Sequence, residues 1–149
     1  MLIGIHPLLT PDLLHALASM GHGDEIAVVD ANFPSVSVGR RVIALPGADA
    51  PQALAAILTV FPLDTGAPPA ALTMAVTGDP GAVPEPVAAF AAVFTERGMA
   101  DLEIGTLARH AFYERARNAF AVVRTGELRK YGNVLLVKGT VNRYPPAPL

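Results

Sequence analysis

The chain has 149 residues, enough for one domain of ordinary size with its own core. It contains no cysteine, which excludes disulfides, thiolate zinc sites and thiol nucleophiles, and its formal net charge of −2 without a basic cluster argues against a nucleic-acid or anionic-membrane partner. Hydrophobic residues make up 52% of the chain and charged residues only 16%, and this apolar excess predicts a homo-oligomer.

No basic segment precedes the first apolar residues, and prolines or charges interrupt every apolar run before the ~18 residues that a membrane-spanning helix requires. We therefore expect a soluble, cytoplasmic protein. Residues 1–149 are predicted to form a single domain, and the proline-rich stretch from about residue 140 to 149 is expected to be extended or disordered.

The first predicted element is a helix. It begins at Thr10-Pro11-Asp12, where a capping threonine precedes a proline at the first helical position, and it ends at Gly21. Glu25 to Val29 is a short apolar run typical of a strand covered on both faces. Arg41 to Leu45 predicts a second strand, followed by a turn and a helix. The apolar positions of that helix are Leu54, Ile57, Leu58 and Phe61.

The rest of the chain continues this alternation. Further strands are predicted at Ala71 to Thr77, Leu102 to Leu107, Phe120 to Arg124 and Asn133 to Lys138, with helices from Pro86 to Gly98 and from Arg109 to Asn118. We expect the last strand to close the sheet. Alternating strands and helices predict a three-layer α/β/α sandwich with a mostly parallel central sheet, in which functional residues gather at strand ends.

His22 lies between two glycines, just before the first predicted strand. An imidazole titrates near neutral pH and can serve as a general acid and base, although a loop histidine is as readily explained by solvation or by capping the preceding helix. No His-x-His or His-Glu-x-x-His spacing occurs, so no metal site is expected. The glycines precede a strand rather than follow one, so they do not predict a phosphate-binding loop.

Other polar residues suit a hydroxyl-rich ligand. Asp30, at the end of a strand, can accept hydrogen bonds from sugar hydroxyls, or it can cap the turn before Phe33-Pro34. Tyr131-Gly132-Asn133 combines a phenol, a glycine that allows close backbone approach and a carboxamide, or it forms a hairpin turn with a satisfied tyrosine. Arg109 and Tyr113 lie four apart on one helix face, which is also typical of a solvated surface.

Four segments carry a resemblance to a known family. They are Gly21-His22-Gly23-Asp24-Glu25, Asp30-Ala31-Asn32-Phe33-Pro34, Phe112-Tyr113-Glu114-Arg115-Ala116 and Lys130-Tyr131-Gly132-Asn133. In this order and spacing, the chain from Leu2 to Gly139 resembles the L-fucose mutarotase and D-ribose pyranase family (the RbsD/FucU family). The Gly-Asp-Glu after the histidine and the Phe-Tyr-Glu-Arg segment resemble the fucose branch.

The resemblance implies an isomerase that interconverts the α and β anomers of L-fucose or a related monosaccharide. It implies that His22 is the general acid and base, with Asp30, Arg109 and residues 131–133 around the sugar. It further implies no cofactor and a cytoplasmic ring-shaped oligomer, commonly a decamer of two stacked pentamers, with sites near subunit contacts. A D-ribose pyranase and a non-catalytic sugar-binding or transport-accessory protein are the alternatives.

The spacing of His22 and Asp30 raises a question about the site. The strand from Glu25 to Val29 spans roughly 17 Å at ~3.3 Å per residue, so the two side chains are expected at opposite ends of it. Our hypothesis is therefore that His22 of one subunit completes a pocket that carries Asp30, Arg109 and Tyr131 of a neighbour.

Overall fold

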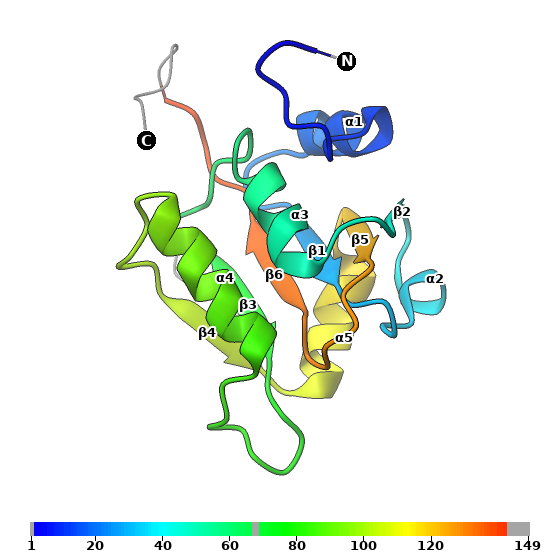
Figure 1. The fold of residues 1–149 in the computed structure, drawn as a ribbon, viewed down its shortest axis with the longest axis vertical. Coiled ribbons are helices and arrows are strands. Elements are labelled where there is room, and N and C mark those ends of the chain that lie inside the picture. Colours follow the sequence, from blue (N-terminus) through cyan, green and yellow to red (C-terminus); the bar gives the residue numbers. More distant parts are fainter. Residues whose placement is uncertain (1, 67–68, 143–149) are drawn as a thin grey trace.

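The computed structural model describes residues 2–66 and 69–142 (Figure 1). Its centre is a six-stranded sheet in the order β2-β5-β1-β6-β3-β4. The strands are β1 (Glu25–Val29), β2 (Val42–Leu45), β3 (Ala71–Met74), β4 (Ile104–Leu107), β5 (Ala121–Thr125) and β6 (Val134–Val137). All neighbouring pairs are parallel except the two that involve β6, so the predicted mostly parallel sheet is confirmed.

Helices cover both faces of this sheet. They are α1 (Pro11–Ser19), α2 (Ser35–Val38), α3 (Ala50–Ile57), α4 (Glu85–Glu96) and α5 (Arg109–Asn118). One core cluster joins α1, α3 and α4 to the sheet, and a second joins α2 and α5 to its other face, which gives the predicted three layers (Figure 1). Among the described residues, no helix is long and apolar enough to cross a membrane.

The burial of β1 explains its uninterrupted apolar sequence. Ile26 and Val28 contribute to the core under α1, α3 and α4, whereas Ala27 and Val29 contribute to the core under α2 and α5. All four residues have no exposed surface. These four positions leave no place for a polar side chain, so the next polar residue after Glu25 is Asp30, directly after the strand ends.

The position of β6 differs from the prediction. We expected the last strand to close the sheet, but β6 lies between β1 and β3 and runs antiparallel to both. Local sequence carries no information about which strands pair, whereas the complete burial of Val134, Leu135 and Leu136 fits a central position. Because β6 is reversed, Asn133 at its start lies beside Asp30 at the end of β1.

Several predicted boundaries also differ. The third strand ends at Met74 rather than Thr77, since the chain turns at Gly78, which has a φ of 86°. Helix α3 ends at Ile57, although Phe61 beyond it is buried as predicted. The short helix α2 was not predicted. Residues 143–149 of the predicted extended tail lie outside the described residues.

Candidate functional site

A pocket of about 260 Å³ opens at the carboxyl ends of the parallel strands. It is lined by Asp30, Asn32, Phe33, Met74, Arg109, Tyr113, Lys130, Tyr131 and Asn133. This volume lies just below the roughly 300–1,000 Å³ typical of small-molecule pockets, so the space suits a small ligand. The structure thus brings together Asp30, Arg109, Tyr131 and Asn133 from distant parts of the sequence.

Asp30 and Asn133 form a reciprocal pair inside the pocket. The backbone N–H of Asp30 donates to Asn133 Oδ1 at 3.0 Å, and Asn133 Nδ2 donates to Asp30 Oδ2 at 2.9 Å. The Asn32 N–H donates to the other carboxylate oxygen, as expected for the turn-capping role, so Asp30 caps the turn and also lines the pocket. Burial raises the pKa of Asp30, although the hydrogen bonds from Asn133 and Asn32 oppose this shift.

Arg109 and Tyr113 extend one wall of the pocket from the first turns of α5. The Tyr113 ring packs edge-on against Phe33, with ring centroids 5.2 Å apart. With Met74, these two rings form an apolar wall. Met74 was not predicted as a site residue, because the strand was expected to continue past it.

Tyr131 has an uncommon backbone conformation, with a φ of 63°. For a residue other than glycine this costs on the order of 1–3 kcal/mol, so surrounding contacts must hold it in place. Its hydroxyl accepts a hydrogen bond from the Thr77 N–H at 3.2 Å. The pKa of the Tyr131 phenol is lowered, chiefly by this bond and less strongly by Arg109. The hairpin alternative is wrong, because β1 separates β5 from β6.

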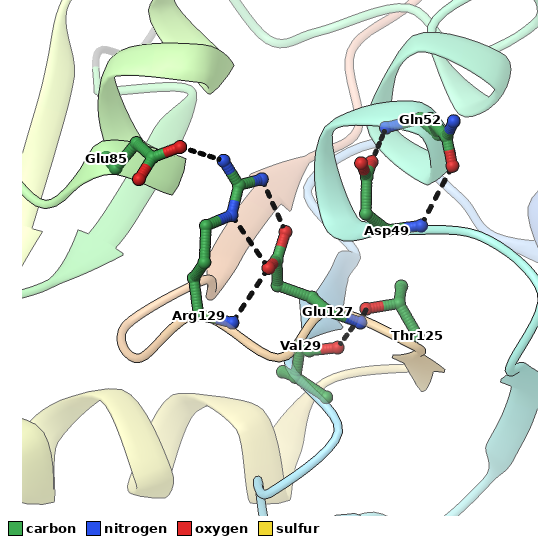
Figure 2. Close-up of polar contacts among 7 residues, drawn as sticks. All are labelled: Val29, Asp49, Gln52, Glu85, Thr125, Glu127 and Arg129. Atoms are coloured by element: carbon green, nitrogen blue, oxygen red, sulfur yellow. Dashed lines mark hydrogen bonds and ion pairs between the residues drawn. The ribbon is translucent and has the colours of Figure 1, made fainter.

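Gly132, which was also predicted to contact the sugar, is not among the residues that line the pocket. A Cβ atom at this position would lie 2.6 Å from Glu127 Cγ, which explains why a glycine is needed here. Glu127 itself forms an ion pair with Arg129, and Arg129 also reaches Glu85 at the start of α4 (Figure 2). No role was predicted for these three residues from the sequence.

His22 lies at the opposite end of the sheet from the pocket. The Gly23 N–H donates to the carbonyl of Lys138 at the far end of β6, whereas Asp30 pairs with Asn133 before the start of that strand. His22 Nε2 lies 3.0 Å from Asp64 Oδ2, and the His22 side chain is 59% exposed. The structure therefore does not bring His22 to the pocket of its own chain. Asp64 was not predicted, because it lies 42 positions from its partner.

The pocket combines hydrogen-bond donors with hydrogen-bond acceptors. Among residues 2–66 and 69–142, no group of three or more histidine or acidic side chains is arranged to hold a metal ion. The cations Arg109 and Lys130 line the pocket together with the carboxylate of Asp30. This mixture of charged, amide and phenol groups beside an apolar wall suits a small ligand that carries several hydroxyls.

Known proteins resemble this chain in sequence and in fold. A sequence model of the RbsD / FucU transport protein family matches residues 3–141. The fucose mutarotase from Streptococcus pneumoniae, solved in complex with L-fucose, is 38% identical with a TM-score of 0.87, over 94% of this chain and 99% of that one. FucU from Bifidobacterium longum is 42% identical with a TM-score of 0.84, over 93% and 99% of the two chains.

A more distant structure shares the fold. RbsD from Bacillus subtilis, solved in complex with D-ribose, is 25% identical with a TM-score of 0.68, over 91% of this chain and 96% of that one.

Proposed function

Because this chain belongs to the RbsD / FucU transport protein family, we propose that it is a sugar mutarotase that interconverts the α and β anomers of L-fucose or a closely related monosaccharide. The observation that carries this proposal is the small pocket around the Asp30–Asn133 pair, in a chain similar along its length to a fucose mutarotase solved with L-fucose. Asp30, Arg109, Tyr131 and Asn133 would contact the sugar hydroxyls, and Gly132, between the last two in sequence, would allow close backbone approach.

The reaction needs only proton transfers. A base removes the proton from the anomeric hydroxyl, an acid protonates the ring oxygen, and the bond between C1 and the ring oxygen breaks to give the open-chain aldehyde. Rotation about C1–C2 and reversal of these steps close the ring with the other configuration at C1. No atom is gained or lost and no electron is transferred, so the chemistry requires no redox cofactor.

His22 is the proposed proton carrier. An ionised carboxylate only accepts hydrogen bonds, so in the contact with Asp64 the Nε2 of His22 carries the proton and donates. In the neutral ring this leaves Nδ1 free to accept a proton. Asp64 would therefore orient the imidazole, in the way that a carboxylate fixes the ring of a catalytic histidine.

The distance between His22 and the pocket supports a site shared between subunits. His22 precedes β1 and Asp30 follows it, so one chain cannot place both side chains on one sugar unless the loop rearranges. We expect a cytoplasmic homo-oligomer, a decamer of two pentamers, in which each pocket receives His22 from a neighbour.

Mixing two variants tests this shared site. His22→Ala and Asp30→Asn proteins, unfolded together in equal amounts and refolded, should recover about one quarter of the wild-type sites, because a random neighbour pair has that chance of combining an intact pocket with an intact histidine. Each variant refolded alone is the control. No recovery in correctly assembled mixtures, or a monomer in sedimentation, would contradict the shared site.

L-Fucose is the proposed substrate because of the apolar wall formed by Phe33, Met74 and Tyr113. A 6-deoxy sugar carries a methyl group on C5 that such a wall can cover, and one methyl group in an apolar pocket changes specificity by roughly 10- to 200-fold. D-Ribose has no such group. The alternative of a D-ribose pyranase uses the same proton transfers, and a non-catalytic sugar-binding protein needs only the pocket.

NMR exchange spectroscopy on equilibrated sugars separates these functions. We expect catalytic amounts of protein to accelerate α–β exchange of L-fucose. The catalytic efficiency on D-arabinose, which lacks the methyl group, should be lower by a factor of about ten or more. Faster pyranose–furanose exchange of D-ribose without an effect on L-fucose would favour the pyranase. If no sugar exchanged faster than in buffer, the remaining function would be non-catalytic sugar binding.

A further inference from the structure

Glu127 carries a charge that the proposed reaction does not use, yet it is 2% exposed. Its Oε1 accepts hydrogen bonds from the backbone N–H and the Nε of Arg129, both at 2.9 Å, and its Oε2 accepts from Arg129 Nη2 at 2.8 Å. The remaining terminal nitrogen, Nη1, donates to Glu85 at 2.8 Å (Figure 2). The pKa of Glu127 is lowered, chiefly by Arg129, so the pair is ionised.

Hydrogen bonds connect the backbone around Glu127 to the residues on both sides of Asp30, at the end of β1. The Ala31 N–H donates to the carbonyl of Glu127 at 2.8 Å. Thr125 Oγ accepts from the Glu127 N–H at 3.2 Å and donates to the carbonyl of Val29 at 2.8 Å (Figure 2). The residues before and after Asp30 are thus tied to the segment that contains Glu127.

The side chain of Glu127 contacts the turn that carries the pocket residues Tyr131 and Asn133. It binds Arg129, two residues before Tyr131, and Gly132 lies so close above it that a Cβ would meet Glu127 Cγ. The positive φ of Tyr131 lies between these two contacts. Such a conformation persists only where neighbouring contacts fix it, and the bidentate ion pair together with the contact at Gly132 provides this restraint.

We infer that Glu127 and Arg129 are positioning residues, which hold the strained turn of residues 129–133 so that Tyr131 lines the sugar pocket and Asn133 keeps its hydrogen bonds with Asp30. This inference rests on the proposed sugar site. Glu127 and Arg129 are absent from the pocket lining, so neither is a catalytic residue. The competing explanation is a buried ion pair that contributes only to stability.

Three variants separate positioning from stability. Glu127→Gln should raise the KM for L-fucose by about tenfold or more, because small displacements of binding groups cost one to two orders of magnitude. The double variant Glu127→Gln/Arg129→Gln removes both charges and should regain thermal stability but not the wild-type KM. Glu85→Gln, whose side chain is 79% exposed, is the matched control and should stay within about twofold of wild type.

The outcomes are distinguishable. A wild-type KM in folded Glu127→Gln, or recovery of KM together with melting temperature in the double variant, would overturn the positioning role. Hydrogen exchange followed by mass spectrometry gives a readout that does not depend on the sugar. Residues 128–133 should lose protection in Glu127→Gln while β1 keeps it, and unchanged protection would overturn the inference even if the wild-type enzyme acts on another sugar.

Discussion

The His22→Ala protein is expected to lose about 10²- to 10⁴-fold of the catalysed anomer exchange, the range typical of acid–base assistance. Its fold and assembly should be unchanged, because the His22 side chain is 59% exposed and the contact that it makes with Asp64 is at the surface. NMR exchange spectroscopy on L-fucose measures the rate, and sedimentation measures the assembly.

His15→Ala is a suitable control for this experiment. His15 is also exposed, on α1, and its backbone carbonyl, which an alanine keeps, accepts a hydrogen bond from the Ser19 hydroxyl. The His15→Ala protein should therefore catalyse anomer exchange at the wild-type rate. Wild-type exchange by His22→Ala would mean that another group carries the proton, and the proposed role of His22 would have to be abandoned.

The Asp30→Asn protein is expected to bind sugar about tenfold or more less tightly and to lose about 1–3 kcal/mol of stability, the cost of an unmatched buried polar group. The two carboxylate oxygens of Asp30 accept from Asn32 and Asn133. An asparagine has only one oxygen, so one of these donors would face an NH₂ group. Asn133 cannot flip to relieve this conflict, because its Oδ1 already accepts from the Asp30 N–H.

The pH dependence of sugar binding gives a second readout on Asp30. Burial raises the pKa of Asp30 above its ordinary value of 3.8, so as the pH falls the carboxylate should be protonated, and the affinity reduced, at a higher pH than for a solvated aspartate. Asp30→Asn should lack this acidic limb. Asp12→Asn, at an exposed position of α1, should retain both the limb and the wild-type affinity. If Asp30→Asn showed the same loss of sugar affinity at low pH, the group that titrates would be a residue other than Asp30.

Local signals predicted most of the fold. The strand Glu25–Val29 and the helix Arg109–Asn118 were predicted with the observed bounds, since an apolar run and a helical pattern each depend on neighbouring residues only. The position of β6 could not be predicted, because insertion between β1 and β3 is a property of pairing across more than 60 residues of chain. The loop at Gly78 was predicted, but the strand before it was predicted to end at Thr77 instead of Met74, because Ala75 and Val76 are also apolar.

The pocket residues could be predicted in part, because strand ends can be recognised from local sequence. Asp30 follows a strand and Asn133 precedes one, and ligands in α/β folds bind at strand ends. Their direct contact spans 103 positions, and the contact of His22 with Asp64 spans 42, so neither partner could be identified from spacing. Glu127 was overlooked because an acidic residue beside a turn glycine is ordinarily solvated.

The central position of β6 has a consequence for how the protein folds. Within the described residues, strands β2, β5 and β1 form one half of the sheet and β3 and β4 form the other, and β6 alone pairs with both halves. Among the described strands, β6 also comes after the other five in the chain. Until Val134–Val137 is inserted, β1 and β3 each present an unpaired edge, so a folding intermediate without β6 in place is the form most exposed to aggregation.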